Sequence, residues 1–206
     1  MTALRPSRIA PTRLFGAALG GLAVGVATSY LQGALPGSWN TVANSGAVWT
    51  VVAFGLAALS VRTRWTAIAA GVLALLGEVA GYYALASPAR GIATTLSERV
   101  LWTMAALVIG PLAGAAGYYW RRGSATERVA AAVGLCGVVL GEGVHELVRI
   151  SADPGAGWAE LVLGGGFAGV AVLASSVPLR GRVVAVAVGV LTAGAVYLSY
   201  GDALLA

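Results

Sequence analysis

Residues 118–150 read YYWRRGSATERVAAAVGLCGVVLGEGVHELVRI, and this stretch decides the fold. Three arginines, Arg121, Arg122 and Arg128, lie in a short polar gap, and a run of about 20 mostly apolar residues follows them. An apolar run of this length forms a helix that crosses the hydrocarbon core of a bilayer, about 30 Å thick. The alternation of gap and apolar run continues from this stretch toward both ends of the chain.

The positive charges follow a regular pattern along the whole chain. There are 13 basic residues, all of them arginine, and most lie in alternate gaps between apolar runs. Cytoplasmic loops of membrane proteins carry such an excess of positive charge. The pattern predicts an all-α polytopic bundle of seven transmembrane helices, with the N-terminus cytoplasmic and the C-terminus extracytoplasmic. The expected spans are 13–33, 46–62, 65–86, 98–120, 126–149, 157–178 and 181–200.

Composition supports a single integral membrane domain over residues 1–206. Hydrophobic residues make up 58% of the chain and charged residues 10%, whereas soluble domains carry roughly 25% charged residues. The net charge of +5 comes from arginines at helix ends rather than from one basic patch. We therefore expect a multi-pass protein of the cell membrane, with the lipid bilayer and no nucleic acid as partner. The first apolar run resembles a signal-peptide core, but no cleavage pattern follows it, so we expect a retained helix.

Two glutamates lie deep within expected spans. Glu78 follows Trp65 by 13 residues and Glu142 follows Arg128 by 14, which places both about 20 Å into the core. An ionisable group at that depth costs several kcal/mol unless it is paired, protonated or hydrated. The pair therefore indicates a functional site. The alternative is structural: each acid caps a kink in a neighbouring helix, or is protonated and hydrogen-bonds to a backbone carbonyl.

A polar stripe extends from the second of these acids. Glu142, His145, Glu146 and Arg149 follow at i, i+3, i+4 and i+7, so they share one face of a helix. This face is expected to point to the bundle interior or to an aqueous cavity. His145 is the sole histidine and Cys136 the sole cysteine, so we expect no metal site and no cofactor.

Aromatic and amide residues gather near the same end of the bundle. Tyr82, Trp102 and Trp158 fall near the expected outer interface, and Asn40 and Asn44 lie in the longest outside segment. Aromatic faces with a nearby carboxylate attract a cationic or heteroaromatic solute. The alternative for most of these rings is anchoring at the headgroup level.

Glycine is abundant, with 30 residues, and its spacing is often small-xxx-small. Such faces favour close helix packing within the chain; the alternative is a docking face for a partner subunit or a second protomer. A weak repeat relates residues 65–83 to 128–147, each reaching Gly-Glu in its second half. If the repeat is real, it indicates duplicated helical hairpins.

Several segments resemble a known family. Residues 30–47 read YLQGALPGSWNTVANSGA, and VWTVVAFGLAAL, LLGEVAGYYAL and IGPLAGAAGYYWRRG follow. Over about residues 14–170 the chain resembles a family of small actinobacterial multi-spanning proteins of unknown function. The resemblance implies membrane location and helix count, and no mechanism. It also draws attention to Gln32, Asn40 and Asn44.

Three functional hypotheses stay open. The first is a small-solute transporter or substrate-binding membrane component, similar in style to vitamin-capturing subunits of uptake systems and in size to three-plus-one-plus-three carriers. The second is a non-transporting subunit that docks a partner, and the third is an intramembrane enzyme acting on a lipid, for which no nucleophile motif is present. In the first, an outward cavity is expected to be lined by Glu78, Glu142, His145, Glu146, Asn40, Asn44, Tyr82, Trp102 and Trp158.

Overall fold

The computed structural model describes residues 11–86, 91–150 and 154–203, with side chains described as far as residue 200. Within these ranges every regular element is a helix. The order is α1 (Pro11–Leu31), α2 (Ser38–Ala43), α3 (Gly46–Ser60), α4 (Arg64–Ala86), α5 (Leu96–Arg122), α6 (Ala125–His145), the π-helical η1 (Glu146–Ile150), α7 (Pro154–Leu173) and α8 (Leu179–Ala203).

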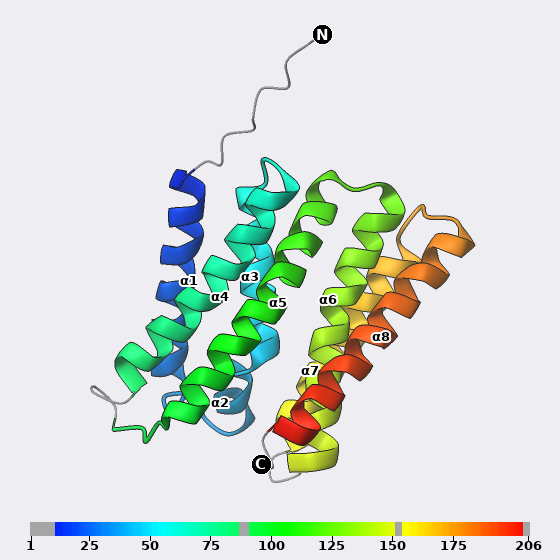
Figure 1. Cartoon of the computed structure of the whole chain (residues 1–206). Coiled ribbons are helices and arrows are strands. Elements are labelled where there is room, and N and C mark those ends of the chain that lie inside the picture. Colours follow the sequence, from blue (N-terminus) through cyan, green and yellow to red (C-terminus); the bar gives the residue numbers. More distant parts are fainter. Residues whose placement is uncertain (1–10, 87–90, 151–153, 204–206) are drawn as a thin grey trace.

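The long helices form two groups of three with α5 between them (Figure 1). In the first group α1 packs mainly on α4, and α3 packs on α4 and α5. In the second group α6 packs on both α7 and α8. The groups meet where α5 and α3 contact α6 and where α2 contacts α7.

Six helices in the described part of the chain are long and apolar enough to cross a membrane. They correspond to six of the seven expected spans, which supports a multi-pass membrane protein. The expected span 46–62 is instead a helix of 15 residues, about 22 Å long at 1.5 Å per residue and so shorter than the core. The predicted count of seven is therefore not confirmed. The helix begins at the expected residue and ends two residues early, at Ser60; before it, Gly37 has a φ of 54° and the chain forms the separate short helix α2.

Glycines bring α1 and α4 into backbone contact. A Cβ on Gly21 would lie 2.0 Å from the carbonyl oxygen of Ala74, and one on Gly25 the same distance from that of Glu78. From the other side, Gly77 faces the backbone of α1. Residue numbers rise together along this contact, so the two helices are parallel. Small residues permit such an approach, which supplies packing where lipid provides no hydrophobic drive.

Glycine contacts also join α6 to α8. A Cβ on Gly137 would lie 2.4 Å from the carbonyl oxygen of Gly189, and one on Gly141 lies 2.5 Å from that of Ala193. Both members of the weak repeat thus use the glycine beside their glutamate for contact with a parallel helix. By contrast, a Cβ on Gly16 would meet no atom within 4 Å.

Further glycines follow the same division. Close intramolecular contacts are made by Gly110, Gly114, Gly117 and Gly164. A Cβ would meet nothing within 4 Å at Gly166 and Gly169. Most of the glycine faces noted in the sequence are therefore used inside the bundle.

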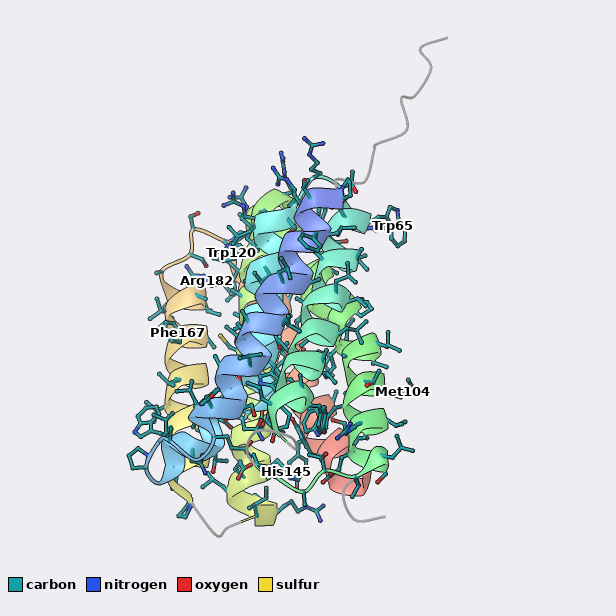
Figure 2. All side chains as sticks on the ribbon, turned by 90° about the vertical axis from the view of Figure 1, so that its left-hand side faces the viewer. Trp65, Met104, Trp120, His145, Phe167 and Arg182 are labelled. Atoms are coloured by element: carbon teal, nitrogen blue, oxygen red, sulfur yellow. The ribbon has the colours of Figure 1, made fainter. Side chains whose placement is uncertain are left out.

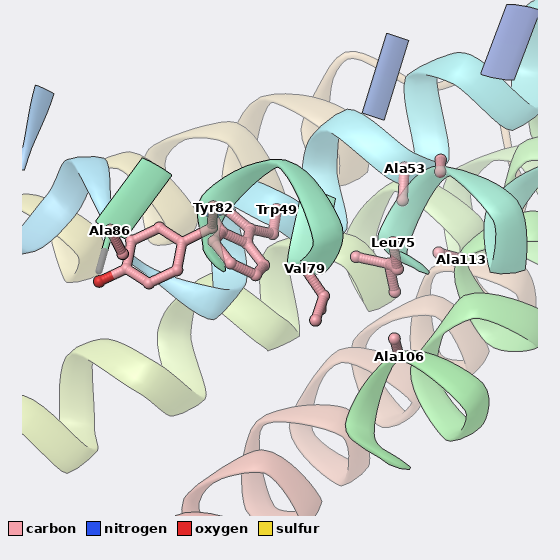
Figure 3. Packing of buried hydrophobic residues seen from close by; sticks show 9 residues of the cluster. Trp49, Ala53, Leu75, Val79, Tyr82, Ala86, Ala106 and Ala113 are labelled. Atoms are coloured by element: carbon pink, nitrogen blue, oxygen red, sulfur yellow. The ribbon is translucent and has the colours of Figure 1, made fainter. Parts of the chain in front are cut away.

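The buried apolar cluster lies between α3, α4 and α5 (Figure 3). Alanines dominate it and let these helices approach one another. The large exceptions are Trp49 and Tyr82, whose ring centroids lie 5.7 Å apart. They stand near the end of the bundle where α3 begins and α4 ends.

The two ends of the bundle differ in chemistry. Trp65, Trp120 and Arg182 lie toward one end and His145 toward the other (Figure 2). We call the first the arginine end, because the helix ends and loops there carry Arg62, Arg64, Arg121, Arg122, Arg128 and Arg182. The opposite end is called the mouth end. Exposed tryptophans such as Trp65 are typical of membrane interfaces.

Candidate functional site at the mouth end

Glu142 of α6 is seated on the N-terminus of α3. Its Oε2 accepts a hydrogen bond of 2.9 Å from the hydroxyl of Ser45, the N-cap of α3. Its Oε1 accepts one of 3.0 Å from the backbone N–H of Gly46, and the N–H of Ala47 donates to Oε2. The first N–H groups of a helix lack intrahelical partners and carry the positive end of its dipole. This buried carboxylate of the second group of helices therefore satisfies N-terminal donors of α3; it caps the start of a helix rather than a kink, and it accepts from N–H groups rather than donating to a carbonyl.

Other polar side chains surround this contact between Glu142 and the N-terminus of α3. The Tyr200 hydroxyl of α8 lies beside Gly46 and the Glu142 carboxylate, and Glu160 of α7 lies against Gly143 of α6. Glu160 is buried, and its Oε2 has no hydrogen-bond partner. We call Glu142, His145, Glu146, Glu160 and Tyr200 the polar cluster. It ties α6, η1, α7 and α8 to the start of α3.

The predicted polar stripe faces the interior over most of its length. Glu142, His145 and Glu146 are all buried. The His145 ring lies 5.0 Å from that of Tyr200, and its Nδ1 is buried without a hydrogen-bond partner. At Glu146 the helix widens into η1, and Arg149 lies 5.8 Å from the ring centroid of Tyr197 on α8. In the part of the chain that the structure describes, no group of three His, Cys, Asp or Glu side chains is placed to hold a metal ion.

Glu78 is placed differently. Its side chain is 0% exposed, and neither carboxylate oxygen has a hydrogen-bond partner. Its backbone carbonyl lies against Gly25 of α1, and it lines neither of the two openings described below. The structure therefore does not place Glu78 and Glu142 in the single chamber that the sequence predicted.

A pocket of about 250 Å³ opens at the mouth end. We call it the mouth pocket. The Tyr82 hydroxyl donates a 2.6 Å hydrogen bond to the side-chain oxygen of Gln32, which fixes one wall. Glu98 is held at the start of α5 by a capping box with Thr95. The lining residues are Gln32, Asn44, Gly46, Trp49, Tyr82, Tyr83, Ile92, Ala93, Thr94, Glu98 and Trp102.

The aromatic rings of this pocket form a connected set. Trp49 lies 6.0 Å from Trp102 and 5.7 Å from Tyr82, and Tyr82 meets Tyr83 edge-on at 5.1 Å. The guanidinium carbon of Arg99 lies 5.3 Å from the ring centroid of Tyr83. One ring of the set therefore already carries a cation on its face.

A larger opening of about 930 Å³ separates α5 from α6 and α8. We call it the interhelical groove. It shares Gly46, Trp49 and Trp102 with the mouth pocket, so the two spaces adjoin. Its other lining residues are Thr50, Leu75, Val79, Leu101, Met104, Ala105, Ala106, Val108, Ile109, Leu112, Ala113, Ala116, Tyr119, Glu127, Ala130, Ala131, Gly134, Leu135, Val138, Val188, Leu191, Thr192, Ala195, Val196, Ser199 and Tyr200.

The predicted site residues thus divide into separate places. Asn44, Tyr82 and Trp102 line the mouth pocket. Asn40 accepts a hydrogen bond from the backbone N–H of Gly33 and stabilises the loop before α2. Trp158 is 60% exposed and lines neither opening, in keeping with an anchoring role.

Three residues of this region escaped the sequence reasoning. Ser45 could have been found as a small polar residue directly before an apolar run, which is an N-cap signal. Trp49 and Tyr200 carry no local signal, because each resembles an ordinary aromatic residue of a membrane helix. Only the packing of distant helices brings them to the site.

The comparison with protein families decides the affiliation of the chain. Residues 5–205 match a family described as a family of unknown function, DUF6518. The protein belongs to this family. Comparisons with curated proteins and with solved structures found no match. The expected resemblance to a family of unknown function is confirmed, and the actinobacterial origin stays a prediction.

Proposed function

We propose that the protein is a membrane component that binds a small cationic or heteroaromatic solute in the mouth pocket, as a substrate-binding subunit or small transporter. The observation that carries the proposal is the lining of this pocket, in which Trp49, Tyr82 and Trp102 are joined by Glu98. Aromatic faces attract positive charge through the ring quadrupole. Glu98 is the charged side chain of the lining, and its negative charge complements the positive charge of the proposed solute.

Amide groups add directional contacts. Gln32 and Asn44 also line the pocket, and each side-chain amide carries both donor and acceptor atoms. A few polar groups within an apolar wall are typical of ligand sites, since they fix the orientation of the solute. A heteroaromatic ring with a positive charge fits this combination of stacking and hydrogen bonding.

The direction of the site follows from a proposed topology. We infer that α3 also crosses the bilayer, giving seven passes with the N-terminus cytoplasmic. In support, α1 begins at the arginine end and α8 ends at the mouth end (Figure 1), which an odd number of passes requires. Arginine-rich ends lie in the cytoplasm. The mouth pocket then opens to the outside.

Binding of simple probes to the protein in lipid nanodiscs tests the proposal. The probes are benzyltrimethylammonium, tetramethylammonium and neutral benzyl alcohol, and binding is measured by calorimetry. We expect saturable binding of the aromatic cation, and we expect Trp102→Ala and Glu98→Gln each to weaken it at least tenfold. Trp158→Ala is the matched control, because this exposed tryptophan lines neither opening. Absence of saturable binding by every probe, or an equal loss in Trp158→Ala, would sink the proposal.

A transport assay separates the two forms of the proposal. Uptake of the bound cation into proteoliposomes that contain the protein alone indicates a transporter. Binding without uptake indicates a substrate-binding subunit that needs a partner.

A further inference from the structure

We propose that the ligand is an amphiphile with a single hydrocarbon tail, and that its tail lies in the interhelical groove while its head occupies the mouth pocket. This inference rests on the proposed function, because the head must be the cationic or heteroaromatic group recognised there. The tail would run along α5 and α8 within the bilayer. It would enter and leave sideways, through the gap between these helices.

The volumes of the two spaces support this division. The mouth pocket holds about 250 Å³, whereas pockets for drug-sized ligands hold about 300–1,000 Å³. By itself the mouth pocket suits a small head group. The adjoining groove, at about 930 Å³, is several times larger.

The two spaces adjoin at a threshold formed by three shared residues. Gly46, Trp49 and Trp102 line both of them. A Cβ on Gly46 would lie 2.5 Å from the Tyr200 hydroxyl and 3.6 Å from the Trp102 ring. The absence of a side chain at this position therefore keeps the threshold open. Trp49 is buried there, and its indole N–H has no hydrogen-bond partner, so it can donate to a polar atom at the junction of head and tail.

The polarity of the groove changes along its length. At the threshold it carries the hydroxyls of Thr50, Ser199 and Tyr200. Beyond them the walls are aliphatic apart from Thr192, until Tyr119 and Glu127 line the far end of the groove at the arginine end. On α5 the lining runs from Leu101 to Tyr119, which is about 27 Å at 1.5 Å per residue and close to the thickness of the hydrocarbon core. A tail held at the threshold therefore has an apolar path through its own leaflet.

Small residues create the space. The walls include Ala105, Ala116, Ala130, Ala131 and Ala195, where larger side chains would fill the gap between α5 and α8. A concave surface that begins at polar groups and continues as an apolar channel differs from the convex face that a helix ordinarily shows to lipid. This gradient matches an amphiphile better than a partner helix, which would present apolar side chains at the threshold as well.

A matched pair of probes tests the inference. Benzyltrimethylammonium carries the head alone, and benzyldimethylhexadecylammonium carries the same head with one tail; hexadecanol supplies the tail alone. Binding in nanodiscs is expressed per mole fraction in the bilayer, so that partitioning of the tail into lipid is removed. We expect the tailed cation to bind at least tenfold more tightly than hexadecanol does.

Two substitutions on α8 form the decisive comparison. Ala195 and Ala187 are both exposed, and only Ala195 lines the groove. We expect Ala195→Phe to weaken the tailed cation at least tenfold, Ala187→Phe to leave it unchanged, and both variants to bind benzyltrimethylammonium normally. Retained binding of that head-only probe also shows that each variant is folded.

The opposite results would overturn either the inference about the tail or the proposed function. Normal binding of the tailed cation by Ala195→Phe, or an equal loss in Ala187→Phe, overturns the inference and leaves the proposed function intact. Failure of both cations to bind overturns the proposed function as well. Equal binding of a fourth probe, benzylmethyldihexadecylammonium, which carries two tails on a benzylammonium head, identifies a two-chain bilayer lipid and overturns the single-chain assignment.

A second measurement does not depend on variants. A diazirine at the tail terminus should label α5 and α8 along the groove when it is photolysed on the wild-type protein. Labelling confined to α1 or α7, or protection of the groove by a co-purified protein, would contradict the placement of the tail.

Discussion

Replacing Glu142 by glutamine tests the seat of α3, because the change removes the charge and keeps the shape. The amide has one acceptor oxygen in place of two, so one of the three donors, such as the N–H of Gly46, faces an NH₂ group instead. A hydrogen bond to a charged group contributes about 1.5–3 kcal/mol and a neutral one about 1 kcal/mol. Losing one such bond and neutralising two more, offset by the lower desolvation cost of an amide, gives a loss of about 3 kcal/mol.

Reversible unfolding in mixed micelles with increasing SDS measures this loss. Circular dichroism follows the bundle as a whole, and a local signal from Trp49, near the start of α3, is obtained in a background in which the other five tryptophans are replaced by phenylalanine. Glu98→Gln is the control, because this exposed glutamate bonds only within its own capping box and is expected to cost less than about 1 kcal/mol. The reasoning is refuted if Glu142→Gln costs no more than Glu98→Gln.

Three further outcomes follow from local geometry. Gly25→Ala places a methyl group against a backbone carbonyl of α4 and should cost more than about 2 kcal/mol, whereas Gly16→Ala meets open space and should be neutral or slightly stabilising, as SDS unfolding of the two variants will show. Thr95→Ala breaks the capping box of α5 and should cost about 1 kcal/mol in the same assay, without altering the unfolding of the second group of helices. In a cysteine-free background, Ala125→Cys should react with an impermeant maleimide only in permeabilised cells and Leu96→Cys in intact cells; the reverse would contradict the proposed orientation.

Much of the architecture could be predicted from the sequence, because burial in lipid imposes strong rules on composition. Six expected spans agree with long apolar helices, since both depend on runs of about 20 apolar residues. The bounds of α3 were close to the expected span 46–62, since the helix begins at Gly46 and ends at Ser60, just before Arg62. What the sequence did not predict is the separate short helix α2 that precedes it.

The site was predicted only in part, for a physical reason. Depth in a span identified Glu142 as costly, but its partner is the start of a helix 95–97 residues earlier, and no local pattern encodes that contact. The same depth argument predicted that Glu78 also belongs to the site, although Glu78 packs beside α1 and does not line the mouth pocket. Trp102 and Trp158 were both predicted as site residues because both lie near the expected outer interface. Only the packing of α5 against α3 places Trp102 in the mouth pocket, whereas Trp158 is exposed on the surface.

The contact between Glu142 and the start of α3 also sets when α3 can be completed during synthesis. Because the acceptor on α6 lies 96 residues after Gly46, translation at about 5–20 residues per second leaves the start of α3 without it for roughly 5–20 s. During that interval a short helix with unsatisfied N–H groups waits in the membrane or its insertion machinery. A nascent chain arrested before α6 should therefore hold α3 open to proteases, and completion of α6 should close it.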